Sequence, residues 1–108
     1  MKIIRFVDEA RAEFLYEVGY YESIEIGLGD KFIGSLRKAS ERALKFPLSG
    51  SPAPARTRKV IINRFPISLV YRPIADGIVI FAVAHHSRKP NYWINRISCE
   101  DSDDLVDG

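Results

Sequence analysis

The apolar residues of this chain change their spacing near residue 57, and this change limits the possible folds more than any other feature. Between residues 8 and 46 they recur every three or four positions, as on one face of a helix. After residue 57 they form short continuous runs that are typical of β-strands. A chain with helices first and a set of strands afterwards is expected to fold in the α+β class.

Two helices are predicted in the first half. Asp8 is placed to cap the first helix and Asp30 to cap the second. Pro47 ends the second helix, and a connection of about four residues makes the pair an antiparallel αα-hairpin. The apolar face of the first helix is expected to contain Ala10, Phe14, Leu15, Val18, Tyr21 and Ile24, and that of the second Phe32, Leu36, Ala39, Ala43 and Phe46.

Four strands are predicted. The N-terminal run KIIRF is one, and KVIIN, ISLVYR and IVIFAVA follow a Pro-rich loop at residues 47–57. The short connections between the last three, one of which contains Asp76-Gly77, predict an antiparallel meander. We therefore expect a small antiparallel sheet, with the N-terminal strand at the edge of the meander and the αα-hairpin covering one face.

The charges are distributed unevenly, although the 108 residues have a formal net charge of only +2. Residues 56–99 contain eight basic side chains and one acidic side chain, whereas residues 100–108 contain five acidic ones and no basic ones. Residues 1–97 are expected to form one domain and residues 98–108 an acidic, disordered tail. The basic half suggests an anionic partner, which is nucleic acid, an acidic protein or the tail itself, and a solvated face is the alternative.

Several classes of protein are excluded by what the sequence lacks. It has no run of about 18 apolar residues and no signal peptide, so a cytoplasmic protein without a membrane partner is expected. The single cysteine, Cys99, allows neither an internal disulfide nor a cysteine-based zinc site. Because there is also no Gly-rich phosphate loop, HExxH or GxSxG motif, we expect no metal and no cofactor.

The run HHSRKPNYWINR contains the residues best suited to chemistry. His85 is able to act as a general acid or base near neutral pH, Arg88 and Arg96 to stabilise phosphate charge, and Tyr92 and Trp93 to stack on a nucleic-acid base. Together they suggest a site that binds a phosphodiester. In the alternative interpretation Tyr92 and Trp93 pack on the sheet edge and His85 simply ends the last strand.

A second basic group, Arg56, Arg58 and Lys59, begins the meander. Because side chains alternate along a strand, Arg58 and Lys59 are expected to face opposite sides unless a bulge intervenes. Arg64 and Arg72 flank turns and are expected to be solvated edge residues that discourage strand pairing.

The order of strand, helical hairpin, Pro-rich loop and meander over residues 2–97 resembles the RelE/ParE superfamily of toxins from bacterial type II toxin-antitoxin modules. The most specific parts are FPISLVYR, the hairpin before IVIFAVAH and the closing pattern H-x-x-R-x-P-x-Y-W. The resemblance implies a toxin whose cognate antitoxin covers its surface. The basic half fits such a partner, because antitoxin segments are often acidic and fold on binding.

The resemblance also implies two alternative targets. ParE-like members poison DNA gyrase, and the VAHHSR run resembles theirs, which favours a growth inhibitor of this type with plasmid-stabilising function. RelE-like members cleave mRNA on the ribosome. In that case His85 or Tyr92 would be the base, Arg88 and Lys59 would hold the phosphate and Trp93 would stack on a base. Arg56, Arg58, Arg64 and Arg96 complete the set expected to contact a target, and whether the chain is an enzyme is left open.

Two further observations bear on this choice. The second basic position of the nuclease set is Ile61 here, and its middle-strand arginine is Ser68. These losses would remove charge stabilisation of the transition state. A third alternative is a non-toxic domain of the same fold that only binds a partner. The tail Glu100–Gly108 lies outside the resemblance, and it is expected either to fold back over the basic surface as a mimic of the antitoxin or to remain solvated.

Overall fold

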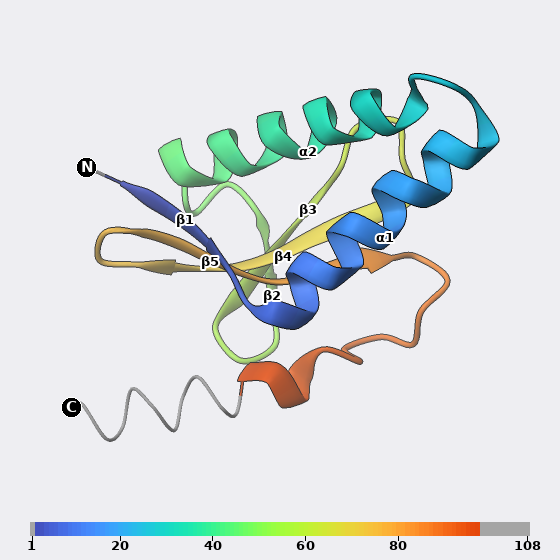
Figure 1. Cartoon of the computed structure of the whole chain (residues 1–108). Helices are drawn as coiled ribbons and strands as arrows, with labels where there is room; N and C mark the ends of the chain where they lie inside the picture. Colours follow the sequence, from blue (N-terminus) through green and yellow to red (C-terminus); the bar gives the residue numbers. More distant parts are fainter. Residues whose placement is uncertain (1, 98–108) are drawn as a thin grey trace.

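A computed structural model describes residues 2–97, and the predicted tail at 98–108 lies outside these residues. Two helices and a five-stranded sheet follow in the order β1, α1, α2, β2, β3, β4, β5 (Figure 1). Their bounds are β1 Ile3–Phe6, α1 Asp8–Ile24, α2 Leu28–Lys45, β2 Ser51–Ala53, β3 Thr57–Ile61, β4 Ile67–Ile74 and β5 Gly77–His85. The predicted α+β class is confirmed.

The sheet order is β1-β5-β4-β3-β2, so β4 and β5 are its central strands. The predicted meander of β3, β4 and β5 is antiparallel, and β1 does join its edge beside β5. However, β1 pairs with β5 in parallel, which makes the sheet mixed instead of wholly antiparallel. Gly77 permits this pairing, because a Cβ atom there would lie 1.8 Å from the carbonyl oxygen of Ile3.

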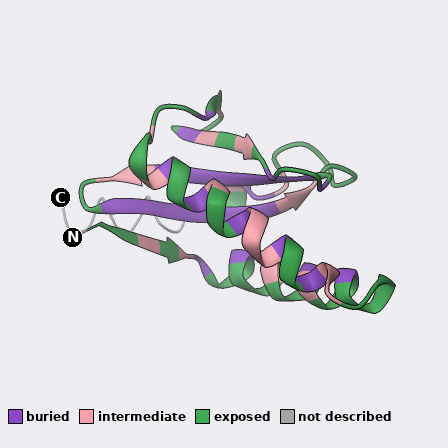
Figure 2. Ribbon diagram, turned by 90° about the horizontal axis from the view of Figure 1, so that it is seen from above, coloured by how far each residue is buried: buried purple, intermediate pink, exposed green. Residues whose placement is uncertain are grey.

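Both helices cover the same side of the sheet, and an aromatic cluster joins them to it (Figure 1). The Phe32 ring packs at 5.5 Å from that of Tyr21 and at 5.1 Å from that of Phe65, which lies between β3 and β4. The Phe14 ring connects this group to Phe6 of β1. Figure 2 shows the central strands buried along most of their length and the helices striped by exposure. The apolar faces of the helices therefore account for one side of the core.

The helix starts differ slightly from prediction. Asp8 is the first residue of α1 and Val7 is the capping residue, so Asp8 stabilises the helix dipole from the first turn without capping. α2 begins at Leu28, ahead of Asp30, after Gly27 with its positive φ of 90°. The Glu22 carboxylate accepts hydrogen bonds from the backbone N–H groups of Gly27 and Gly29. Glu22 thus does the capping that was predicted for Asp30.

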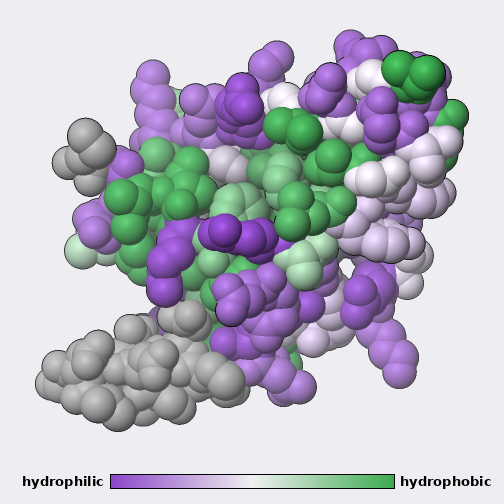
Figure 3. All heavy atoms as spheres, in the orientation of Figure 1, coloured by the Kyte–Doolittle hydropathy of each residue, from purple (hydrophilic) through white to green (hydrophobic). Residues whose placement is uncertain are grey.

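α1 exposes more apolar surface than its spacing predicts. Ala10 and Tyr21 are buried and Phe14 and Val18 are partly buried, but Leu15 and Ile24 are mostly exposed. The predicted apolar face was too wide, since the sheet covers only part of the helix circumference. In Figure 3 hydrophobic residues gather between the two helices and hydrophilic residues line the outer side of α2.

The Pro-rich loop is more ordered than predicted, because its residues 51–53 form the short edge strand β2 beside β3. Tyr71 Oη donates to the carbonyl of Pro47 at 2.6 Å, and Arg58 Nη1 donates to the carbonyls of Leu48 and Gly50. Arg72 donates to the carbonyl of Ala55. Arg72 is buried, so its prediction as a solvated edge residue was wrong: it points inward and holds the loop on β4.

After β5 the chain passes α1 on the side away from α2 (Figure 1). We call this stretch, residues 86–97, the closing segment. It buries Trp93 and Ile97 in the core. Residues 94–97 are helical. Among the helices of residues 2–97, none combines the length and the hydrophobicity that a membrane span requires.

Candidate functional site

The closing segment is held to α1 by a single carboxylate, that of Glu13. Its two oxygens accept four hydrogen bonds. Arg96 donates two of them, from Nη1 at 2.8 Å to Oε1 and from Nη2 at 3.0 Å to Oε2. Tyr92 Oη donates to Oε2, and the backbone N–H of Val83 on β5 donates to Oε1 at 3.0 Å. A bidentate arginine pair of this kind is strong and directional, so Glu13 fixes the closing segment to both α1 and β5.

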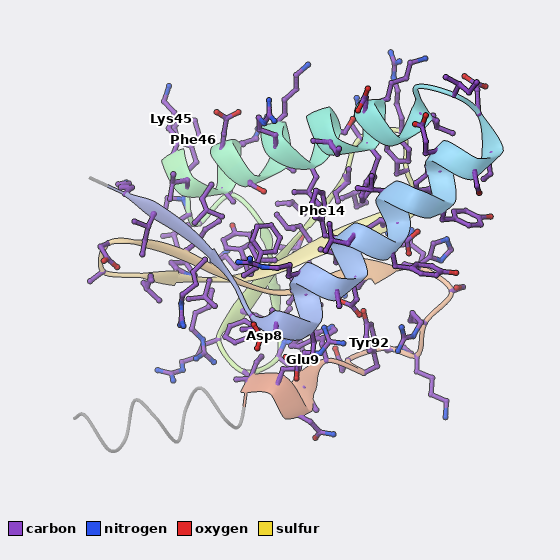
Figure 4. All side chains as sticks on the ribbon, viewed as in Figure 1. Asp8, Glu9, Phe14, Lys45, Phe46 and Tyr92 are labelled. Atoms are coloured by element: carbon purple, nitrogen blue, oxygen red, sulfur yellow. The ribbon has the colours of Figure 1, made fainter. Side chains whose placement is uncertain are left out.

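Arg88 completes this group, which we call the Glu13 cluster (Glu13, Arg88, Tyr92 and Arg96). Its guanidinium lies over the Tyr92 ring at 4.0 Å, and its Nη1 is 4.0 Å from Glu13 Oε2. The Arg88 side chain remains half exposed, whereas that of Arg96 is largely buried and also donates to the carbonyl of Phe81. Figure 4 shows Tyr92 below α1, on the side opposite Phe14.

The electrostatics of the cluster follow from burial. Desolvation raises the pKa of Tyr92 well above its ordinary value of 10.0, and the hydrogen bond to Glu13 raises it further. Desolvation alone would lower the pKa of Arg96, but the hydrogen bond and charge of Glu13 raise it above its ordinary value. The phenol of Tyr92 is therefore held protonated and the guanidinium of Arg96 charged, which favours a structural role for both.

The two histidines lie at the end of β5 with different partners. The Nδ1 atom of His85 accepts the backbone N–H of Ser87 at 3.1 Å, which leaves the proton of the neutral ring on Nε2. His86 Nε2 is 2.9 Å from Ser68 Oγ. Both histidines line a pocket of 220 Å³ that we call the histidine pocket, together with Lys59, Ser68, Arg88, Lys89, Tyr92 and Trp93. Five of the predicted site residues thus meet there: Lys59, His85, Arg88, Tyr92 and Trp93.

Trp93 lines this pocket but is only 2% exposed. A ring that is buried in the core has no free face for a nucleic-acid base. This position supports the alternative interpretation, in which Trp93 packs on the sheet, and it corrects the expectation of base stacking.

The other predicted contact residues are divided among separate surfaces. Arg56 and Arg58 border a pocket beside the Pro-rich loop, whereas Lys59 lies at the histidine pocket. Arg58 and Lys59 therefore face different sides, as alternation along a strand predicts. Arg64, in the turn between β3 and β4, is exposed and borders a third depression beside α2. The basic half does not form one continuous site.

That third depression, which we call the basic groove, has a volume of 900 Å³ and runs between α2 and the end of β3. Its cations are Lys31, Lys38, Arg42 and Arg64. Leu28, Ala39, Ile61 and Phe65 are among its apolar residues, and Ile61 is largely exposed. Three of the four cations come from α2, a helix that the charge count over residues 56–99 left out.

A fourth depression borders the Glu13 cluster and shares Glu13 and Arg88 with it. We call this depression the tyrosine pocket, and it has a volume of 490 Å³. It is lined by Glu13, Tyr16, Glu17, Tyr20, Val83, His85, Ser87 and Arg88. Sequence reasoning missed both glutamates. The available signal was Glu17, which lies seven residues after Ala10 and four before Tyr21, in the middle of the apolar stripe of α1. Among residues 2–97, no group of three acidic, histidine or cysteine side chains is placed to hold a metal ion.

Comparison with known proteins identifies the family. Residues 4–90 match the family described as "ParE toxin of type II toxin-antitoxin system, parDE". The chain belongs to this family. The match covers the helices, the sheet and the start of the closing segment, up to Pro90. Membership in this toxin family implies a cognate ParD antitoxin as partner.

A solved structure described as the chromosomal ParDE toxin-antitoxin system from P. aeruginosa has the same fold. The match has a TM-score of 0.65 at 18% sequence identity and covers 79% of this chain and 96% of the other. At this identity the similarity supports the fold of the ParE toxin and not its individual site residues. No curated protein sequence matches the chain.

Proposed function

We propose that this ParE toxin arrests bacterial growth by binding DNA gyrase in the cytoplasm, and that it does so without cleaving RNA. The observation that carries the proposal is the hydrogen bond that Tyr92 donates to Glu13. A general base must lose its proton at the pH of the cell, and the hydrogen bond and burial hold the proton on Tyr92. Tyr92 is thereby unsuited to the role that a nuclease would require of it.

The cationic set of a nuclease is also incomplete. Ile61 and Ser68 occupy two positions where RelE-like nucleases have basic residues, and Ser68 is hydrogen-bonded to His86. Single groups that stabilise transition-state charge are typically worth about 3 kcal/mol. Two such losses, with Arg96 occupied by Glu13, favour a binding surface over a catalytic site.

The histidine pocket supports the second candidate function, an mRNA endonuclease. It brings Lys59, His85 and Arg88 to one depression, where a histidine base and two phosphate-binding cations would be in reach of one another. Arg88 is half exposed, so it is available to a ligand. In this candidate mechanism His85, and not Tyr92, takes the proton of the 2′-hydroxyl.

Expression without antitoxin distinguishes the candidates, with labelled thymidine and methionine followed over the first minutes of arrest. Gyrase poisoning predicts that thymidine incorporation falls first and that the purified toxin inhibits supercoiling by purified gyrase. An earlier fall in methionine incorporation, abolished by His85→Ala and Arg88→Ala, would favour the endonuclease. If neither falls, the domain only binds a partner.

For the antitoxin we propose the basic groove as one contact surface. Its apolar residues and its four cations suit an amphipathic segment with acidic side chains, which would bury Ile61 and pair with Lys38 and Arg42. The double substitution Lys38→Glu/Arg42→Glu is expected to weaken antitoxin binding by about 100-fold, or about 3 kcal/mol. The matched control Arg37→Glu, on α2 but outside the groove, is expected to bind normally. Equal effects of both would exclude the groove.

A further inference from the structure

The tyrosine pocket contains the carboxylate of a mostly buried residue, Glu17, that has no partner in the part of the fold that the structure describes. Glu17 as a whole residue is only 8% exposed, but its carboxylate oxygens still reach the pocket, and no hydrogen bond or ion pair reaches them from residues 2–97. Burial of an unpaired carboxylate disfavours its ionised form. Desolvation accordingly raises the pKa of Glu17; the nearby His85 opposes this and Glu13 adds to it. A carboxylate kept in this state has unused capacity for a positively charged ligand.

Two tyrosines stand beside this carboxylate with their rings exposed. Tyr16 is 68% and Tyr20 47% exposed, their centroids are 6.4 Å apart, and their planes differ by 11°. Because they are one helical turn apart on α1, they form a nearly parallel aromatic surface at the border of the pocket. Aromatic faces attract cations, and flat cations most effectively.

The arginine that already lines the pocket does not fill this role. Arg88 already lies over the Tyr92 ring and within 4.0 Å of Glu13 Oε2, and it forms no ion pair with Glu17. The Nδ1 atom of His85 already accepts a hydrogen bond from the backbone N–H of Ser87. One unpaired carboxylate beside aromatic rings offers too few oxygen ligands for a metal ion, but it matches a guanidinium, which pairs with a carboxylate through two parallel hydrogen bonds.

The surroundings indicate a protein as the source of the cation. Ile24 continues the spacing of Tyr16 and Tyr20 along the same side of α1 and is exposed, as is Ile26 in the following turn. A row of exposed apolar side chains that leads away from a pocket is typical of a protein interface. We propose that the tyrosine pocket receives an arginine side chain of a protein partner, which lies against Tyr16 and Tyr20 and donates to Glu17.

NMR titration of the full-length protein with N-acetyl-arginine amide tests the proposal. We expect saturable shifts of the Tyr16, Glu17 and Tyr20 signals, and binding about tenfold weaker for the neutral citrulline analogue, as loss of one charged pair predicts. The lysine analogue is also expected to bind more weakly. Equal binding of arginine and citrulline, or of arginine and lysine, would overturn the proposal, as would shifts centred elsewhere.

Variants locate the site. Glu17→Gln keeps the shape of the side chain and is expected to weaken binding of the arginine probe about tenfold, whereas Glu41→Gln, an exposed glutamate on α2, should bind like the wild type. Tyr16→Leu is a second variant at an exposed position whose folding is not in question, and it should weaken binding severalfold. Undiminished binding by Glu17→Gln and Tyr16→Leu would refute the assignment. None of these results depends on whether the toxin poisons gyrase.

Discussion

Glu13 and Glu17 are one turn apart on the same helix, and their surroundings are opposite. Glu13 accepts four hydrogen bonds and joins α1 to β5 and the closing segment. Glu17 is buried as well but has no hydrogen-bonding partner among residues 2–97. A buried carboxylate that is fully paired holds a structure together, whereas an unpaired one costs stability. The comparison separates a residue that the fold uses from one that remains available for binding.

The largest effect is expected for Glu13→Ala. It leaves the buried Arg96 guanidinium without its counter-ion, and loss of one member of such a pair costs about 3 kcal/mol. Urea denaturation would measure the loss. The control Glu9→Gln, at an exposed position in the first turn of α1, should cost less than about 1 kcal/mol. A loss for Glu13→Ala as small as that of the control would mean that the cluster does not stabilise the fold.

The second largest loss of stability is expected for Tyr92→Phe. It removes one hydrogen bond to a charged acceptor, worth about 2 kcal/mol, and keeps the ring that supports Arg88. Because Tyr92 is proposed to be structural, the variant should remain toxic at a temperature where it is folded. Denaturation and growth arrest are measured on the same variant. A folded variant without toxicity would return Tyr92 to the list of catalytic residues.

Glu17→Gln is expected to stabilise the protein, in contrast to the two preceding substitutions. The pKa of Glu17 is raised above 4.5 in the folded protein, so the native state binds more protons than the unfolded state just above that pH. Stability is therefore lost as pH rises from the unfolded pKa through the folded pKa, and the cost is fully present above the folded pKa. The amide removes this cost and should stabilise the protein by up to about 1 kcal/mol at pH 7. The gain should vanish below pH 4.5; a gain that persists there would have another cause.

The smallest effect on stability is expected for Tyr16→Ala, within about 0.5 kcal/mol, because the ring is mostly exposed. Tyr21→Ala is the matched contrast on the same helix, since that ring is buried against Phe32 and Phe65 and its loss should cost about 3 kcal/mol. Thermal unfolding of the two variants compares them. A large loss for Tyr16→Ala would show that the tyrosine surface belongs to the core and not to an interface.

The sequence predicted the fold because its signals are local. The helix spacing, Pro47 and the runs of the meander act within a few residues, and each element formed near its expected place. The parallel pairing of β1 was not predicted, because nothing in residues 2–6 specifies the direction of a neighbour that lies more than seventy positions away. β2 was missed because Pro52 is atypical of strands, although it is tolerated at a sheet edge.

The site was less predictable than the fold, because it depends on contacts between residues that are far apart in the sequence. His85, Arg88 and Tyr92 were singled out from their types, but the partner that decides what they do is Glu13, on a different element. A glutamate on a predicted amphipathic helix is ordinarily solvated. Arg72 and Trp93 show the converse, since their residue types suggested a surface role and tertiary packing buries both.

The distance in sequence between Glu13 and Arg96, 83 residues, affects how the protein is made. While the ribosome still holds the last part of the chain, β1 lacks its neighbour β5 and α1 lacks the segment that clamps it. Contacts between distant parts of a chain are slow to form, because closing the intervening loop costs entropy. A nascent or prematurely terminated chain is therefore expected to be harmless, and the toxin acquires its surface only when its synthesis is nearly finished.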